Sequence, residues 1–269
     1  MYKTLLPEVE SIARAAGKLV MEVYQRDFDV MFKADKSPVT EADLLASEYI
    51  ESALKELAPE IPFLSEESAA VPFSERSRWD TYWLIDPVDG TKSFVKKTGE
   101  FTVNIALIHH HQPVLGVVYV PVTGVNYYAA EGAGAFKRHV DGGITTIVAR
   151  ELVNPPVITG NLSRSGGMEN FLEKVGPHEL IIMNSSLKIC LVAEGSADLY
   201  ARFWPTSEWD TAAGHAVVKE AGGTLVDMEM QPLLYNTKDS LLNPYFFVMG
   251  DHQKDWSKYI DDYVDDSNS

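Results

Sequence analysis

The sequence predicts an α+β fold, and three observations carry that prediction. The chain opens with two segments whose apolar residues recur at helical spacing. Three later segments alternate or run apolar between turn residues, as antiparallel strands do. The second half then alternates short apolar runs with helical patterns, which is typical of α/β units. With 269 residues, 45% of them hydrophobic, the chain can build one domain or two tightly joined domains.

Two amphipathic helices are expected at the start of the chain. Apolar residues recur at helical spacing over residues 5 to 24. The segment SPVTEADLLASEYIESALKEL predicts a second helix, for which Thr40 is a suitable N-cap and Asp43 follows three residues later. Asp43 is expected on the inward side of the first turn of that helix.

Strand patterns and a change of composition divide the rest of the chain. The apolar run YWLI, which ends at Asp86, predicts a buried strand. FTVNIALI, PVLGVVYVP and VNYYAAEG predict antiparallel strands of one large sheet. Glycines and paired prolines in DGGITTIVARELVNPP indicate a boundary between an N-terminal α+β half, 1–154, and a C-terminal α/β half, 155–269. The later strands are expected at PVITG, LIIMN, ADLYARF, GTLVD and YFFVMG, with helices at roughly 185 to 194 and 209 to 221.

The charge balance limits the classes of partner. There are 23 basic and 39 acidic residues, a net charge of −16, so repulsion disfavours nonspecific binding to nucleic acid. An acidic enzyme acting on a phosphate ester needs a local cation, which points to a bound metal. The single cysteine, Cys190, excludes an internal disulfide and is expected to be buried. We find neither a transmembrane run nor a secretory signal, and expect a cytoplasmic protein.

The segment WLIDPVDGT holds the most informative residues. A buried strand there delivers Asp86 and Asp89 into a turn that Pro87 makes rigid and Gly90 permits. Both carboxylates and the carbonyl of Val88 can point to one place, and magnesium prefers such oxygen ligands. The alternative is a simple turn, since Asp, Pro and Gly are frequent in turns.

Further acidic residues lie elsewhere in the chain. Glu66 and Glu67 follow a short apolar strand in LSEES, and Asp210 starts a helix in EWDTAAGHAVVKEAGG. The glutamates could instead be solvated loop charges, and Asp210 could simply favour the positive end of its helix.

In this order and at these separations, SPVTEAD, LSEES, WLIDPVDGT, GEFTVNIAL and WDTAAGHAV resemble the inositol-monophosphatase superfamily, whose signatures are DPxDGT and WDxAA. The resemblance covers almost the whole chain and implies a layered αβαβα sandwich of the metal-dependent sugar-phosphatase type. The strings KTGEFTVNIALI, GVVYVP, SSLKICLVAEG and YARFWPTSEWDTAAGHA are similar in particular to CysQ-type 3'(2'),5'-bisphosphate nucleotidases.

The resemblance also implies a site. Two or three Mg²⁺ ions would be held by Glu66, Asp86, the Val88 carbonyl, Asp89 and Asp210. The residues that orient or deprotonate the attacking water would be Asp43, Glu66 and Thr91, although Asp43 and Thr91 could also act as helix caps. Substrate contacts would come from Glu66, Val88, Asp89, Gly90, Thr91 and Asp210.

The second half should bind the rest of the substrate. Ser185, Ser186 and Lys188 offer hydroxyls and a cation where an anion could lie, or Ser185 could only cap a helix. Arg202 suits a second phosphate, with a surface salt bridge as the alternative. Weaker cationic candidates are Lys92 and Arg164.

Histidines do not indicate a metal site. His109 to His111 occupy the expected turn between two strands, where adjacent side chains do not converge easily on one ion. His215 lies inside the helix that follows Asp210, and a packed histidine is expected there.

The resemblance implies hydrolysis of the 3'-phosphate of adenosine 3',5'-bisphosphate to AMP and phosphate, with 3'-phosphoadenylyl sulfate as a second candidate substrate. Such an enzyme would serve sulfate assimilation and be sensitive to lithium. Two alternatives stay open: an inositol or sugar monophosphate phosphatase, and a catalytically silent regulatory protein with the same fold. Some relatives are assigned peripheral contact with the inner membrane. The sequence specifies no oligomeric state.

Overall fold

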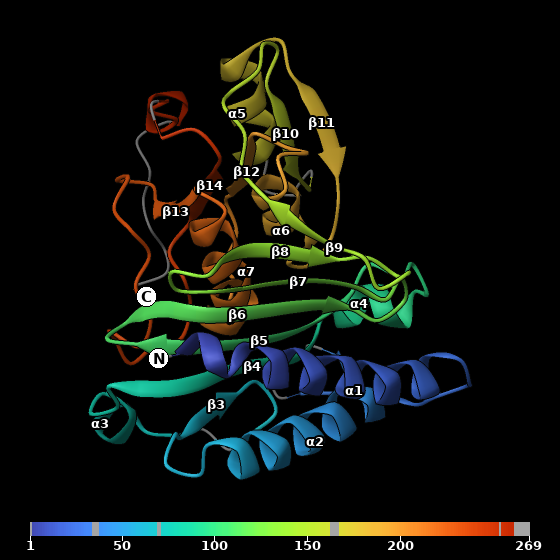
Figure 1. Cartoon of the computed structure of the whole chain (residues 1–269). Coiled ribbons are helices and arrows are strands. Elements are labelled where there is room, and N and C mark those ends of the chain that lie inside the picture. Colours follow the sequence, from blue (N-terminus) through green and yellow to red (C-terminus); the bar gives the residue numbers. More distant parts are fainter. Residues whose placement is uncertain (1, 34–37, 69–70, 162–166, 253, 261–269) are drawn as a thin grey trace.

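The chain folds into alternating layers of helix and sheet (Figure 1). The computed structural model describes residues 2–33, 38–68, 71–161, 167–252 and 254–260, so Arg164 lies outside the described residues. Two helices cover one face of a large sheet, two more lie between that sheet and a smaller one, and a fifth helix covers the far side of the smaller sheet. The predicted α+β sandwich is confirmed.

The outer helical layer forms where the sequence predicts it. It consists of α1 (Leu6–Tyr24) and α2 (Glu41–Leu57). Thr40 caps α2 in a capping box: its hydroxyl accepts the N–H of Ala42 at 3.2 Å, and its own N–H donates to Asp43 at 2.8 Å. The apolar faces of both helices pack on one side of the large sheet in a shared core.

The large sheet has seven strands in the order β3-β4-β5-β6-β7-β8-β9. The pair β3 and β4 is parallel, and the following pairs are antiparallel. β4 continues beyond the predicted end at Asp86 as far as Asp89, with a register shift between these residues. The strands are β3 (Phe63–Ser65), β4 (Thr81–Asp89), β5 (Thr102–His109), β6 (Gln112–Val120), β7 (Val125–Ala130), β8 (Gly134–Arg138) and β9 (Ile144–Ile147).

The middle layer contains α6 (Leu187–Ala193) and α7 (Glu208–Glu220), close to the predicted ranges. α7 lies directly on the large sheet: a Cβ atom at Gly116 would stand 2.2 Å from the carbonyl oxygen of Ala213. Glycine permits this close approach because it has no side chain. A helix of the second half is thereby packed against the sheet of the first.

The smaller sheet has five strands in the order β11-β10-β12-β14-β13, and α5 (Gly167–Val175) covers its outer face. All five strands were predicted from the sequence, whereas α5 was not. The strands are β10 (Val157–Gly160), β11 (Glu179–Ile182), β12 (Leu199–Arg202), β13 (Thr224–Asp227) and β14 (Phe246–Met249). The shorter elements are η1 (Tyr2–Thr4), β1 (Val30–Phe32), β2 (Pro38–Thr40), α3 (Phe73–Arg76), α4 (Thr91–Val95) and η2 (Ser257–Tyr259).

The predicted boundary near residue 155 falls between the two sheets. The large sheet ends at β9 and the small sheet begins at β10, on either side of residue 155. The division into two units stays a prediction, because α7 joins the halves through one core.

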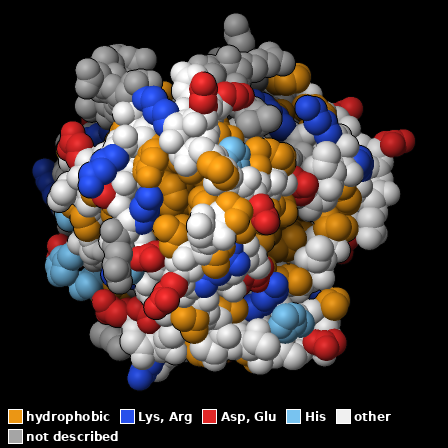
Figure 2. Space-filling view, turned by 90° about the horizontal axis from the view of Figure 1, so that it is seen from above, with side chains coloured by type: hydrophobic (Ala, Val, Ile, Leu, Met, Phe, Trp, Pro, Cys, Tyr) orange, Lys and Arg blue, Asp and Glu red, His pale blue; other side chains and the backbone are white. Residues whose placement is uncertain are grey.

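Seen from above, hydrophobic side chains gather across the middle of the face, with Lys and Arg side chains among them (Figure 2). None of the helices in the described ranges is long and apolar enough to cross a membrane.

Candidate active site

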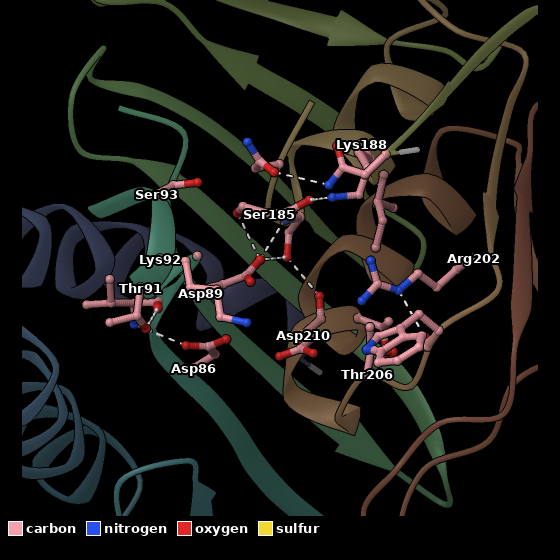
Figure 3. A pocket seen from close by; sticks show the side chains of 18 of the residues that line it. Asp86, Asp89, Thr91, Lys92, Ser93, Ser185, Lys188, Arg202, Thr206 and Asp210 are labelled. Carbon is pink, nitrogen blue, oxygen red and sulfur yellow. Dashed lines mark hydrogen bonds between the residues drawn. The ribbon is translucent and has the colours of Figure 1, made fainter. Parts of the chain in front are cut away.

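Three carboxylates from distant parts of the chain meet in one cavity of about 440 Å³ between the halves. Asp86 and Asp89 come from the end of β4, and Asp210 comes from the first turn of α7 (Figure 3). One oxygen from each lies within 4.8 Å of the other two. The register shift in β4 lets both of its aspartates reach the cavity, and the N–H of Ser207 donates to Asp210 at 2.9 Å.

Burial and mutual repulsion make this cluster suitable for a cation. Burial, together with the charges of Glu66 and Asp89, raises the pKa of Asp86 well above its usual range. Burial and the neighbouring carboxylates raise the pKa of Asp210 to about 8. A divalent ion between the three oxygen ligands would offset both effects, so the residues present fit such an ion.

Glu66 lines the same cavity, and its carboxylate forms an ion pair with Lys33. The ammonium of Lys33 lies 2.7 Å from Glu66 Oε1 and 2.7 Å from Glu67 Oε1. Burial raises the pKa of the Glu66 carboxyl, and Lys33 opposes that effect. Glu66 follows β3 as expected, whereas Lys33 was missed, because no local pattern indicates a partner 33 residues away.

Asp43 and Thr91 face each other beside the cluster. The Thr91 hydroxyl lies 3.3 Å from Asp43 Oδ1 and 3.2 Å from the carbonyl of Val88, and it can donate to either. Thr40 donates to the other oxygen of Asp43 from its N–H and its hydroxyl. Asp43 is 2% exposed, and burial raises the pKa of its carboxyl. Asp43 is therefore part of the capping box of α2 and also meets Thr91, so the capping interpretation is confirmed and the catalytic one stays a prediction. The N-cap of α4 is Gly90, so Thr91 is not a cap.

The serines at the start of α6 bind a carboxylate of the cluster. Ser185 donates its hydroxyl to Asp89 Oδ2 at 2.8 Å, and Ser186 donates its N–H to the same oxygen at 2.6 Å. The hydroxyl of Ser186 lies 2.7 Å from that oxygen and 2.8 Å from the carbonyl of Asp210. Neither serine hydroxyl caps α6. Their observed contacts orient Asp89, and the expected contact with a substrate anion stays a prediction.

Two cations stand on the opposite side of the cavity from the β4 aspartates (Figure 3). Lys188 is buried, and its ammonium donates to the carbonyl of Ser185 at 2.8 Å. Burial and the charge of Arg202 lower the pKa of Lys188 to about 8, although the neighbouring carboxylates oppose this. Arg202 donates from Nε to the carbonyl of Trp204 at 2.9 Å. Within the described residues, neither side chain forms an ion pair, so both charges stay available to an anion.

The structure thus brings the expected site together. Every residue proposed as a ligand or substrate contact lines the one cavity, and Asp43 reaches it through Thr91. His110 and His111 occupy the turn between β5 and β6, and His215 is buried with Nδ1 3.0 Å from the Tyr235 hydroxyl, as the sequence predicts. Lining residues to which the sequence analysis assigned no role, because they carry no charge, are Asn161, Tyr200, Trp204, Thr206 and Phe246.

The comparisons with known proteins agree with this site. The model of the Inositol monophosphatase family matches residues 2–261. The chain belongs to the inositol monophosphatase family. It is 47% identical over 247 residues to a protein of Shigella flexneri named 3'(2'),5'-bisphosphate nucleotidase CysQ, covering 91% of this chain and 99% of that one. The protein of the same name in Escherichia coli K12 is 47% identical over 246 residues, with the same coverage.

A solved structure extends the likeness to three dimensions. The crystal structure of CysQ from Bacteroides thetaiotaomicron, described as a bacterial member of the inositol monophosphatase family, has 40% identity and a TM-score of 0.78. The match covers 91% of this chain and 96% of that one. The family is metal-dependent, and the structure contains an acidic cluster of Asp86, Asp89 and Asp210.

Proposed function

We propose that this protein is a metal-dependent phosphomonoesterase that removes the 3'-phosphate of adenosine 3',5'-bisphosphate, giving AMP and phosphate, and that acts also on 3'-phosphoadenylyl sulfate. The observation that carries the proposal is the close grouping of Asp86, Asp89 and Asp210 in one cavity with Lys188 and Arg202, which form no ion pair with any described residue. Identity of 47% over nearly the whole chain to proteins named as such nucleotidases supports the choice of substrate.

Magnesium is the ion that we assign to the acidic cluster. Its ligands would be Asp86, Asp89, Asp210, Glu66 and the carbonyl of Val88, all of which are oxygen donors lining the cavity. When bound, two or three Mg²⁺ ions supply a Lewis acid for the phosphoryl oxygens and lower the pKa of a bound water. Glu66 can join this set without losing Lys33, since the ammonium lies 2.7 Å from Oε1 and Oε2 can face the metal.

Thr91 and Asp43 are the residues that we assign to the attacking water. The Thr91 hydroxyl can pass its proton toward Asp43 Oδ1, 3.3 Å away, while its oxygen accepts a proton from water. Asp43 is fixed for this task by two hydrogen bonds from Thr40, so its free oxygen faces Thr91. Glu66, which lines the same cavity, is a second candidate for the same role.

The cations bind the remainder of the substrate in this proposal. Lys188 and Arg202 stand on the side of the cavity opposite the β4 aspartates, where their charge would attract a second phosphate (Figure 3). Arg202 can bind two phosphate oxygens at once through its planar guanidinium. A neutral inositol ring offers no partner for these charges, which favours the bisphosphate over inositol monophosphate.

The decisive measurement is phosphate release from adenosine 3',5'-bisphosphate and from inositol 1-phosphate in Mg²⁺, with chromatography of the nucleotide product. We expect a higher kcat/KM for the nucleotide, AMP with its phosphate at the 5' position, and inhibition by Li⁺. A preference for inositol 1-phosphate would identify the same-fold alternative, a sugar monophosphate phosphatase.

Asp86→Asn provides the control for metal dependence. The amide keeps the size of the side chain but removes one charged oxygen ligand from a buried cluster, so we expect phosphate release to vanish. Exposed Asp80→Asn, on the same chain segment, should keep full activity. Activity that survives both Asp86→Asn and chelation by EDTA would reject the metal-dependent mechanism. A cytoplasmic location and the oligomeric state stay open to experiment, and no described feature supports contact with a membrane.

A further inference from the structure

A second hollow of about 570 Å³ adjoins the cavity that holds the carboxylates. Five residues line both spaces, so the two form one continuous cleft. The shared residues are Lys92, Asn161, Tyr200, Arg202 and Trp204, and the second hollow adds Met168, Ala201 and Phe203. The acidic cluster lies in the first cavity alone, whereas the second is walled chiefly by apolar and aromatic residues.

Trp204 is the most unusual residue of this wall. Its side chain is 55% exposed, although tryptophan is mostly buried in folded proteins. The backbone at this position is held, because the Trp204 carbonyl accepts the Nε hydrogen of Arg202 at 2.9 Å. Trp204 lies in the short strap between β12 and α7, residues 203–207. This strap leads directly into Asp210, so a few residues of backbone join the indole to the acidic cluster.

The side chains that line the cleft therefore change along its length from acidic to basic to mainly apolar. It begins with carboxylates, passes the cations Lys92 and Arg202, and ends in the hollow beside Trp204. A ligand that fits this order carries a phosphate at one end, further negative charge in the middle and a flat, uncharged ring at the other end. An exposed indole is suited to such a ring, because aromatic faces stack on nucleobases of any kind.

We propose that the hollow beside Trp204 is the base subsite, and that Trp204 stacks on the purine of the nucleotide. The proposal deepens the proposed function and rests on it. Trp204 is here a specificity-determining residue: it separates nucleotides from phosphate esters that have no base and takes no part in bond breaking. Met168, on α5, closes the hollow from the side of the smaller sheet.

The test compares two bisphosphates in the full-length protein: adenosine 3',5'-bisphosphate and its abasic tetrahydrofuran analogue. For Trp204→Ala, we expect kcat/KM for the nucleotide to fall by about 10-fold to 100-fold, chiefly through KM, because stacking on the base is the same in ground and transition states. The analogue, which lacks a base, should be hydrolysed at the wild-type rate.

Two further variants keep this result interpretable. Trp204→Phe retains an aromatic face and should recover most of the loss, which a purely structural defect in the strap would not permit. Leu234→Ala truncates another exposed hydrophobic residue, 45% exposed and outside both cavities, and should leave both substrates unaffected. Equal losses on the nucleotide and on the abasic analogue would overturn the assignment of the base subsite.

Equilibrium binding separates this proposal from the nucleotidase activity. Titration calorimetry of AMP and of ribose 5-phosphate requires no turnover. We expect wild type to bind AMP more tightly, and Trp204→Ala to bind the two alike. If the nucleotide is not hydrolysed but this difference is found, only the proposed reaction fails. If the nucleotide is hydrolysed and wild type binds both ligands equally, the base subsite fails.

Discussion

Ser186 donates its backbone N–H and its hydroxyl to the same oxygen of Asp89, at 2.6 and 2.7 Å. The two residues are 97 positions apart in the chain and belong to different halves of the molecule. Asn104 donates to the Ser186 hydroxyl at 2.8 Å, which leaves the hydroxyl proton free to point at Asp89 or at the Asp210 carbonyl. The start of α6 thus orients one carboxylate of the proposed metal site.

Ser186→Ala should weaken metal binding. The substitution removes one of the hydrogen bonds that orient Asp89, and the loss of such supporting bonds typically costs about 10-fold to 100-fold in metal affinity. We expect a higher Mg²⁺ concentration for half-maximal phosphate release and a matching change in calorimetric Mg²⁺ binding. Ser196→Ala, in an exposed part of the same segment, is the control. An unchanged Mg²⁺ curve for Ser186→Ala would show that the serine has no positioning role.

Thr91→Val should lower kcat with little change in KM. Valine has nearly the same shape but lacks the hydroxyl that lies 3.3 Å from Asp43 Oδ1. Loss of a positioned proton-transfer group commonly costs about 100-fold to 10,000-fold in rate. Steady-state kinetics at saturating Mg²⁺ provide the measurement, and Thr98→Val, which loses only a weak contact to the Ser93 carbonyl at 3.5 Å, is the matched control. Retention of more than half of the wild-type kcat in Thr91→Val would contradict the assigned role.

Acid should destabilise the protein partly through His215. Burial, with a smaller contribution from Lys219, lowers the pKa of this imidazole to about 3. The unfolded chain has a histidine pKa of about 6.5, so between these values it binds a proton that the folded state excludes. The stability that neutral His215 contributes is complete above about pH 6.5, the pKa of the unfolded chain. As the pH falls from there toward the folded pKa of about 3, this contribution decreases by about 1.4 kcal/mol for each pH unit.

Urea unfolding at pH 7 and pH 5 tests this dependence. His215→Asn keeps a partner for the Tyr235 hydroxyl near the position of Nδ1 but carries no titratable group. The variant should lose less stability between the two pH values than wild type does, even if it is less stable at pH 7. Comparing the two proteins cancels the carboxylates that titrate in the same range. Identical pH dependences would mean that His215 accepts a proton in the folded state.

Arg76→Met should destabilise the fold without touching the site. Arg76 is 2% exposed and donates to the Asn236 side chain and to the carbonyls of Lys238 and Asp239. Leaving buried acceptors without a donor costs roughly 1 to 3 kcal/mol each, so we expect a loss of about 3 kcal/mol in the free energy of unfolding. Arg78→Met, two residues away and exposed, should change it by less than about 0.5 kcal/mol.

Much of the fold was predictable because its signals are local. The hydrophobic pattern specified α1 and α2, and Thr40 with Asp43 specified the capping box, since hydrogen bonds and apolar faces of this kind involve residues close in sequence. The strands β3 to β7 of the large sheet and the five strands of the smaller sheet followed from alternating or continuous apolar runs. The helix α5 and the strands β8 and β9 were missed, because short elements at the periphery have incomplete patterns.

The site was predictable in its residues but not in its contacts. The acidic residues of the β4 end and of α7 stand in motifs, so the sequence by itself determined which oxygens could hold a metal. Only the tertiary structure decided that Lys33 engages Glu66, that Ser186 orients Asp89, and that Trp204 faces a hollow beside the acidic cluster. The Lys33–Glu66 pair forms within the first half, where no local pattern links the two residues. The contact of Ser186 with Asp89 and the hollow beside Trp204 exist because packing of α7 between the two sheets brings both halves to one cleft.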